Sequence, residues 1–307
     1  MARFLAKLLL FSAVLALATM AALRGPSQRA VDTFYWKFTT PARSLILGSS
    51  RALQSLDPAI IALDARDEGP LLNFAFTIAN SPYGPVYLRA ISRKVPASVR
   101  RGVFLLEVNP LLVSINAQER EDAETFRERH LTLDRQGVFT LDPNYDYLLR
   151  NFRSPLYRLL GPPLPSREHP QRNGWLQLSV PMDAPTLAAR RKRGIEAYAG
   201  VFQQHRLSPL RIEWLRKTIA FLHEHGSPML VRLPTSPEMA ALEAAYAPDF
   251  DTLMAGLAAE TGAAYLNLLP ESATFETTDG NHLSVESARR CSQRVGAELR
   301  GLPRDGR

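Results

Sequence analysis

The sequence predicts an α/β fold built on a mostly parallel sheet, and two observations support that prediction. Short apolar runs bounded by helix-breaking residues recur along the chain, and amphipathic segments lie between several of them. Short, uniformly apolar runs are typical of strands buried on both faces, as in a parallel sheet covered by helices. Their alternation with helices indicates an α/β sandwich. The predicted strands are Ser44–Leu47, Leu71–Phe76, Val103–Val108, Met229–Leu233 and Ala264–Leu268.

Two segments carry clear helix signals. In the first, Ser208 can cap the helix, Pro209 occupies the first turn, and apolar residues repeat at helical spacing until Gly226. In the second, Ser284 is the expected cap of a closing helix with one apolar face that includes Cys291. Cys291 is therefore expected in the core. It is the single cysteine of the sequence, so an internal disulfide is excluded.

Residues 1–30 predict a signal anchor or a signal peptide. Arg3 and Lys7 precede an uncharged run from Leu8 to Leu23, after which Arg24 restores the charge. A cleaved signal peptide is an alternative to an anchor, because Ala16–Ala18 offers a small-residue cleavage site, and a buried helix is a third. The run is slightly shorter than the roughly 20 residues that a spanning helix prefers. We expect an exported protein attached to membrane lipid, at the periplasmic face of an inner membrane or outside the cell.

Residues 40–307 are expected to form one domain with a long insertion. A chain of 307 residues with 46% hydrophobic content can bury a substantial core, and no repeat, low-complexity tract or linker divides it. Between about residues 112 and 207 the sequence is polar, rich in proline and weakly periodic, and no crossover between strands needs that length. We interpret this segment as an insertion near the substrate end of the sheet. The alternative is a surface excursion without a role.

The charge balance narrows the range of partners. The chain has 37 basic and 30 acidic residues, a net charge of +7 that favours anionic lipid, polymer or nucleic acid. Arg190–Arg193 would suit lipid headgroups or an anionic polymer, or else form a solvated helix face. Nucleic acid is not expected, because basic residues are not interleaved with aromatic ones. A metal or other cofactor is not expected either, because the histidines are scattered and no glycine-rich phosphate loop occurs.

Polar residues follow the predicted strands at the positions where parallel α/β sheets bind ligands. Such sheets bind ligands beyond the carboxyl ends of their strands. Ser50 follows the first strand, Asn109 follows the third, and Asp279 and His282 follow the last. We expect these four residues to meet along one rim of the sheet.

The four residue types fit nucleophilic catalysis by a serine. A serine hydroxyl is a weak nucleophile until an imidazole takes its proton, and the imidazole needs a carboxylate to fix its tautomer. Asp279 and His282 are three residues apart in a turn eased by Gly280, so they can supply both groups. The Asn109 amide and the Ser50 backbone N–H are candidate donors to an oxyanion. Taken singly, each residue also has an ordinary interpretation as a helix cap, a partly buried histidine or a turn.

The order of these motifs resembles the SGNH, or GDSL-like, hydrolase superfamily. The shared features are Gly-x-Ser after the first strand, Asn after the third, and Asp-x-x-His before the last helix, within about residues 44–299 outside the insertion. The resemblance implies a flavodoxin-like three-layer αβα sandwich with a mostly parallel sheet, here preceded by a transmembrane or signal segment. It also implies a triad of Ser50, His282 and Asp279, with Asn109 as an oxyanion donor. "ILGSSR" behind a membrane segment looks like the branch that includes the D-alanyl transfer protein of teichoic acid modification and exopolysaccharide acetylation proteins.

The chain departs from the family pattern in its first and third blocks. Ser49 stands where the first block has an aspartate, so both Ser49 and Ser50 are candidate nucleophiles. Alignment of the preceding glycine favours Ser50. The third block is Glu107–Pro110, which keeps only the asparagine of Gly-x-Asn-Asp.

The second block lacks the glycine that contributes to the family's oxyanion hole. No glycine lies between Gly69 and Gly84, and the backbone N–H groups of residues 77–80 are the substitutes we consider. The second oxyanion donor therefore stays open at this point. Residues expected to support the site are Ser49, Arg51 and Asn80.

The resemblance and the N-terminal segment imply an envelope-located serine esterase or O-acyltransferase that acts on acyl groups of cell-surface carbohydrate or lipid. Ser50 would attack, His282 would act as base and then acid, and Asp279 would hold His282. The implied partners are membrane lipid, an acylated substrate and, for transfer, a membrane acyltransferase. The alternative is a non-catalytic SGNH-like scaffold that binds a surface polymer or assists a membrane acyltransferase, because the oxyanion hole is incomplete. A lipase-like role on phospholipid is a third hypothesis.

Overall fold

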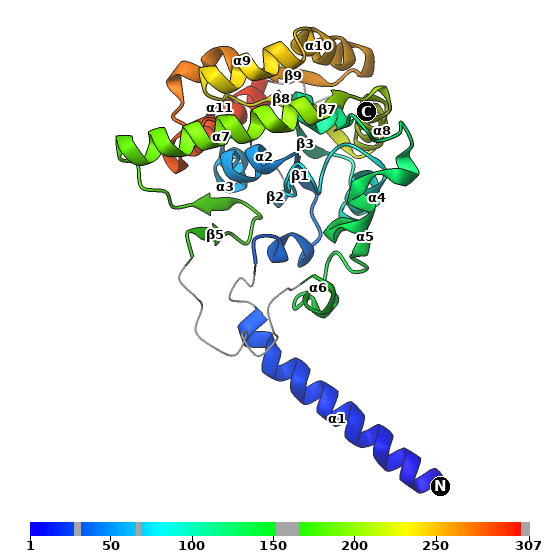
Figure 1. Cartoon of the computed structure of the whole chain (residues 1–307). Helices are drawn as coiled ribbons and strands as arrows, with labels where there is room; N and C mark the ends of the chain where they lie inside the picture. The colour runs from blue at the N-terminus through cyan, green and yellow to red at the C-terminus, as the bar shows by residue number, and fades with distance from the viewer. Residues whose placement is uncertain (28–31, 66–68, 152–165, 302–307) are drawn as a thin grey trace.

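The computed structural model describes residues 1–27, 32–65, 69–151 and 166–301. At its centre is a five-stranded sheet in which every pairing is parallel (Figure 1). The strand order is β2–β1–β3–β8–β9, which is the flavodoxin-like order of a doubly wound sheet. The predicted fold class is therefore confirmed. The strands are β1 (Ser44–Leu47), β2 (Leu71–Asn73), β3 (Gly102–Glu107), β8 (Gly226–Arg232) and β9 (Ala264–Asn267).

Helices cover both faces of the sheet, and strand side chains alternate between the two resulting cores. On β1, Leu45 and Leu47 lie in one core and Ile46 lies in the other. Burial of these two apolar layers holds the three-layer arrangement together. The first core is covered by α4 (Pro85–Lys94), α8 (Pro209–His223) and α10 (Phe250–Thr261). The second is covered by α2 (Ser50–Ser55), α3 (Pro58–Ala65) and α11 (Val285–Gly301).

The two helices with capping signals form as predicted. The Ser208 hydroxyl accepts from the Arg211 N–H at 3.1 Å at the start of α8. The Ser284 hydroxyl accepts from the Ser287 N–H at 3.2 Å at the start of α11. Each cap satisfies a backbone donor that has no partner inside its helix. Cys291 lies on the buried face of α11 and is fully buried, as predicted.

Residues 112–207 lie outside the central sheet. β4 (Ser114–Asn116) and β7 (His205–Leu207) pair antiparallel, which brings the two ends of this segment together. The 21-residue helix α7 (Ala184–Gln204) runs across the domain beside α9 (Pro237–Tyr246) (Figure 1). A helix of this length was not expected in a weakly periodic segment. Residues 152–165 of the predicted insertion lie outside the described residues.

The other elements are short. The segment also contains β5 (Glu168–Pro170) paired with β6 (Leu176–Leu178), and the helices α5 (Thr132–Arg135) and α6 (Tyr145–Arg150). The 3₁₀ turns are η1 (Tyr35–Phe38), η2 (Pro110–Val113), η3 (Ala123–Thr125), η4 (Arg127–His130) and η6 (Leu269–Thr274). These elements connect the sheet and its helices without adding a strand to the central sheet.

The N-terminal helix α1 (Ala2–Ser27) extends away from the domain (Figure 1). The apolar stretch Ala2–Ala21 has a mean hydropathy of 2.1, and none of it is buried. Its length and composition suit a helix that crosses a membrane, and they equally suit a signal sequence. The Tyr145 hydroxyl donates to the carbonyl oxygen of Met20 at 2.6 Å, which joins α1 to α6. The predicted apolar N-terminal helix is therefore present.

Candidate active site

Ser50, His282 and Asp279 form one hydrogen-bonded chain. The Oγ of Ser50 lies 2.8 Å from Nε2 of His282, and Nδ1 of His282 lies 2.8 Å from Oδ2 of Asp279. Ser50 stands at the carboxyl end of β1, and the other two come from the turn before α11, more than two hundred positions later. The side chains of His282 and Asp279 are 13% and 19% exposed. This hydrogen-bonded chain of three residues is thus partly screened from water and still accessible at the surface.

The turn before α11 is built so that Asp279 orients His282. Oδ1 of Asp279 accepts from the backbone N–H groups of Asn281 and His282, both at 2.9 Å, which leaves Oδ2 for the imidazole. Gly280 has a φ of +89°, a conformation that glycine adopts readily. Burial raises the pKa of Asp279, but its hydrogen bonds with His282 and the His282 charge lower it more. The net pKa lies well below the usual range, so the carboxylate is ionised at neutral pH.

Ser49 faces away from the imidazole. Its hydroxyl lies 2.8 and 3.0 Å from the two carboxylate oxygens of Glu107, and its backbone N–H donates to Oε2 at 2.6 Å. The same hydroxyl accepts from the Arg51 N–H at 3.3 Å and so caps α2. Of the two candidate serines, Ser50 contacts His282, and Ser49 contacts a buried carboxylate.

Glu107 organises the loop after β1, a role that the sequence analysis missed. It is fully buried at the end of β3 and accepts from Ser49, from Asn109 and from the Ala52 N–H at 3.3 Å. Gly48 is required beside it, because its φ is +142° and a Cβ there would lie 2.5 Å from the Glu107 side chain. The available signal was an acidic residue closing an apolar strand, since a buried carboxylate needs partners.

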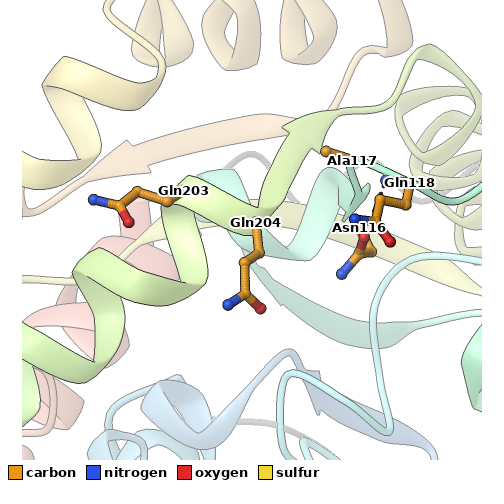
Figure 2. Close-up of a pocket in the computed structure, with 5 residues that line it drawn as sticks. All are labelled: Asn116, Ala117, Gln118, Gln203 and Gln204. Carbon is orange, nitrogen blue, oxygen red and sulfur yellow. Dashed lines mark hydrogen bonds between the residues drawn. The ribbon is translucent and has the colours of Figure 1, made fainter.

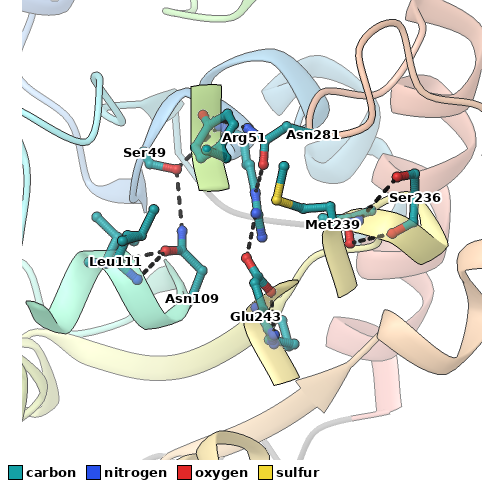
Figure 3. Close-up of polar contacts among 12 residues, drawn as sticks. Ser49, Arg51, Asn109, Leu111, Ser236, Met239, Glu243 and Asn281 are labelled. Atoms are coloured by element: carbon teal, nitrogen blue, oxygen red, sulfur yellow. Dashed lines mark hydrogen bonds and ion pairs between the residues drawn. The ribbon is translucent and has the colours of Figure 1, made fainter. Parts of the chain in front are cut away.

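Asn109 lies beside Glu107 and makes no hydrogen bond with Ser50 in the described part of the chain. Its Nδ2 donates to Oε1 of Glu107 at 2.6 Å and to the Ser49 hydroxyl at 3.5 Å. Its Oδ1 accepts from the Leu111 N–H at 3.0 Å, which caps η2 (Figure 3). The amide protons of Asn109 are therefore engaged inside the protein in this structure.

The segment after β2 folds into a turn beside the loop after β1. The Ser81 hydroxyl donates to the carbonyl oxygen of Gly48 at 2.6 Å, which joins the two loops. The Asn80 backbone N–H donates to the Thr77 carbonyl oxygen, and its Nδ2 donates to the Thr77 hydroxyl, both at 2.9 Å. The Asn80 N–H is thus occupied inside the turn. The N–H groups of residues 77–79 make no hydrogen bond within the described segments.

Arg51 connects the triad turn to a buried network of ion pairs (Figure 3). Its Nε donates to Oδ1 of Asn281 at 2.6 Å, and its Nη2 lies 2.5 Å from Oε1 of Glu243. Arg232 pairs with the other Glu243 oxygen, also at 2.5 Å. Burial raises the pKa of Glu243, but the two guanidinium groups lower it more, and the net pKa is below its usual value. Removing one partner would leave a buried charge without compensation.

The helix α7 packs directly over the triad turn and adds a side chain that the sequence analysis did not single out. Nδ2 of Asn281 donates to the Tyr198 hydroxyl at 2.8 Å. The same Nδ2 lies 3.3 Å from Nε2 of His282, so the Tyr198 phenol lies beside the triad. Gly194 allows this approach, because a Cβ there would lie 2.4 Å from the carbonyl oxygen of Asp279. A lone tyrosine in an amphipathic helix carries no sequence signal for such a position.

The basic cluster Arg190–Arg193 is divided between the site and the surface. The guanidinium of Arg190 lies 4.0 Å from Oδ2 of Asp279. Arg191 lies 3.7 Å from a Glu238 carboxylate oxygen, and the other two side chains of the cluster are exposed. Only part of the cluster is therefore free to meet a lipid or polymer.

A surface pocket lies at the far end of α7, apart from the triad (Figure 2). The residues that line it carry no titratable side chain, and the pocket therefore offers no acid, base or nucleophile. Its lining consists of Asn116, Ala117, Gln118, Gln203 and Gln204. In the described ranges, no group of three or more His, Cys, Asp or Glu side chains is placed to hold a metal ion.

Two comparisons of the sequence with known proteins found no match. No protein-family model matches it, and no curated protein matches it. Among solved structures, the inhibitor-bound form of an aryl esterase from M. smegmatis is similar at 8% sequence identity and a TM-score of 0.38, over 85% of this chain and 100% of that chain. We therefore base the proposed chemistry on side-chain geometry.

Proposed function

We propose that this protein is a serine esterase or O-acyltransferase attached to a membrane by α1. The observation that supports the proposal most directly is the chain Ser50–His282–Asp279, with 2.8 Å at both of its hydrogen bonds. A hydroxyl, an imidazole and an ionised carboxylate in that order are the parts of an activated serine nucleophile.

The proton positions follow from the contacts. Asp279 is an acceptor at Nδ1 of His282, so the neutral imidazole carries its proton on Nδ1. Nε2 then has a lone pair directed at Ser50, which makes His282 the general base and Asp279 the group that holds its tautomer. The low pKa of Asp279 keeps it charged, so that it stabilises the imidazolium formed when the serine proton is taken.

The reaction runs in two halves. Ser50 Oγ bonds to the carbonyl carbon of an acyl ester, its proton passes to Nε2, and the carbonyl π electrons move to the oxygen. The bond to the leaving alcohol then breaks, the alcohol takes the proton from Nε2, and acyl-Ser50 remains. Water or a sugar hydroxyl repeats the sequence on acyl-Ser50, which releases a carboxylic acid or a new ester.

The oxyanion needs donors at the start of α2. Ser50 is the first residue of that helix, where a backbone N–H has no acceptor inside the helix, and we propose this N–H as one donor. Asn109 can act as another only if its Nδ2 turns from Glu107 toward the substrate, because the two groups are 2.6 Å apart in this structure.

The location and the substrate class are further parts of the proposal. With α1 in the membrane, the triad would stand at the extracytoplasmic face and act on acyl groups of cell-surface carbohydrate or lipid. In the transfer version, a membrane acyltransferase would deliver the acyl group. The length and apolar character of Ala2–Ala21 support the anchoring.

Turnover of p-nitrophenyl acetate by the full chain in detergent, with and without an oligosaccharide acceptor, tests the proposal. We expect Ser50→Ala and His282→Ala to lower kcat by about 10³-fold or more. Ser92→Ala is the matched control, because it removes an exposed serine hydroxyl on α4 and should retain wild-type turnover. A folded wild type without turnover under either condition would argue for the non-catalytic scaffold.

A further inference from the structure

We propose that the Tyr198 phenol donates a hydrogen bond to the oxyanion of the acyl-transfer intermediate, so that the segment containing α7 completes the active site. The inference rests on the proposed function above. It assigns a catalytic role to a side chain outside the motifs of the triad.

The amide of Asn281 has one orientation that suits its neighbours. Arg51 has only donors, and its Nε lies 2.6 Å from Oδ1 of Asn281. Nδ2 therefore faces the Tyr198 hydroxyl at 2.8 Å and Nε2 of His282 at 3.3 Å. Because Glu243 holds the Arg51 guanidinium at 2.5 Å from the buried side, the orientation of this amide is fixed.

The Tyr198 hydroxyl accepts a hydrogen bond from Asn281, which leaves its own hydrogen available to donate. The phenol lies beside the imidazole, because the same Nδ2 of Asn281 is 3.3 Å from Nε2 of His282, which is 2.8 Å from Ser50 Oγ. The phenol is therefore close to the triad with its own hydrogen available to donate. Burial is the largest effect on the pKa of Tyr198 and raises it, so the phenol stays protonated at neutral pH.

Once Ser50 bonds to the substrate, the phenol is needed as a hydrogen-bond donor at the carbonyl oxygen of the substrate. When Ser50 Oγ bonds to the carbonyl carbon, negative charge develops on the carbonyl oxygen, which is two bonds away from Oγ. A phenol beside the triad can reach that oxygen by a movement of the Tyr198 side chain. The phenol keeps its proton throughout, and its hydrogen bond strengthens only as the charge develops, which is what lowers a barrier.

Two of the other candidate donors near the serine are already occupied. Nδ2 of Asn109 donates to Glu107 at 2.6 Å, and the N–H of Asn80 donates to Thr77 at 2.9 Å. The Ser50 N–H and the N–H groups of residues 77–79 make no hydrogen bond within the described segments, so they are the backbone donors that are available. Tyr198 would add a side-chain donor to these backbone groups.

The helix that carries Tyr198 is held firmly against the triad turn. Gly194 packs on the carbonyl oxygen of Asp279, where a Cβ would come within 2.4 Å. One turn beyond Tyr198, the Phe202 ring packs against the Tyr246 ring of α9, with centroids 4.9 Å apart. Tyr198 is therefore positioned by packing on both sides, as an oxyanion donor must be.

The rate constant for covalent labelling by a fluorophosphonate, measured on the full chain in detergent, tests the inference. The phosphonyl oxygen takes the place of the oxyanion, so Tyr198→Phe should lower this rate constant by about 10²-fold. Tyr198→Phe should also lower kcat for p-nitrophenyl acetate by a similar factor and leave KM within about threefold, because the interaction forms only in the transition state. The thermal midpoint reports whether the variant is folded.

Tyr246→Phe is the matched control. It removes a phenol hydroxyl from the same apolar cluster, but that hydroxyl lies 2.8 Å from Ser114 and outside the triad. It should label at the wild-type rate. If the wild type labels at Ser50 and Tyr198→Phe labels within twofold of it, the inference is overturned and the proposed function stands. If the folded wild type is not labelled, both are overturned.

Discussion

Replacing Glu107 by glutamine should both destabilise the protein and slow the candidate nucleophile. The carboxylate accepts from the Ser49 N–H at 2.6 Å, from the Ser49 hydroxyl at 2.8 Å and from Nδ2 of Asn109 at 2.6 Å. Glutamine presents an amide NH₂ in place of one oxygen, so a donor meets donors in a fully buried position. The loop that carries Ser50 would lose its anchor.

The magnitude follows from the number of hydrogen bonds affected. A hydrogen bond to a charged group contributes about 1.5–3 kcal/mol. At least two donors lose a charged acceptor in Glu107→Gln, so the free energy of unfolding should fall by about 3 kcal/mol or more. At about 2–4 °C per kcal/mol for a domain of this size, Tm should fall by about 6–12 °C.

Denaturant unfolding followed by tryptophan fluorescence measures the stability, and phosphonate labelling measures the nucleophile. Glu224→Gln is the matched control, since Glu224 is exposed and its replacement should change the free energy of unfolding by less than about 0.5 kcal/mol. If Glu107→Gln unfolds like this control and labels at the wild-type rate, the buried carboxylate does not hold the loop.

Three further predictions follow from single side chains. Gly48→Ala places a Cβ 2.5 Å from the Glu107 side chain at a φ of +142°. The free energy of unfolding should therefore fall by about 2–5 kcal/mol, and an unchanged denaturation midpoint would contradict this prediction. Asp279→Asn should lower phosphonate labelling by about 10²–10⁴-fold. Because the pKa of Asp279 is depressed in the folded state, its contribution to stability is lost only as pH falls below 3.8. Asp279→Asn should therefore flatten the fall of the free energy of unfolding with pH in that range, and parallel curves for the variant and the wild type would count against the prediction. Burial lowers the pKa of Lys94 from 10.5 to about 7. Between these pH values the unfolded chain binds more protons than the folded one, so the stability should rise with pH. Lys94→Met should flatten the rise in Tm from pH 7 to 9, and equal slopes for the variant and the wild type would refute the reasoning.

The fold could be predicted because its signals are local. A strand such as Ser44–Leu47 is uniformly apolar because both of its faces are buried, and helix caps such as Ser208 and Ser284 act within three residues. The approach of Ser50 to His282 could be anticipated for a related reason. Both follow strands of a parallel sheet, and the carboxyl ends of those strands share one rim.

The surroundings of the site could not be predicted, because they depend on contacts between distant residues. Glu107 accepts from Ser49 across 58 positions, and nothing in the local sequence distinguishes it from an exposed acid at a strand end. Glu107 also accepts from Nδ2 of Asn109 at 2.6 Å, and so engages the amide that the sequence offers as a candidate oxyanion donor. Tyr198 reaches the site only because α7 packs over the triad turn through Gly194, a tertiary contact without a local pattern.

Peptide mapping of the fluorophosphonate adduct on the folded full chain tests the central claim most directly. We predict one adduct, on Ser50, that disappears in Ser50→Ala and His282→Ala and persists in Ser92→Ala. An adduct on Ser49, or no adduct on a chain that unfolds cooperatively, would contradict the assignment of Ser50 as an activated nucleophile.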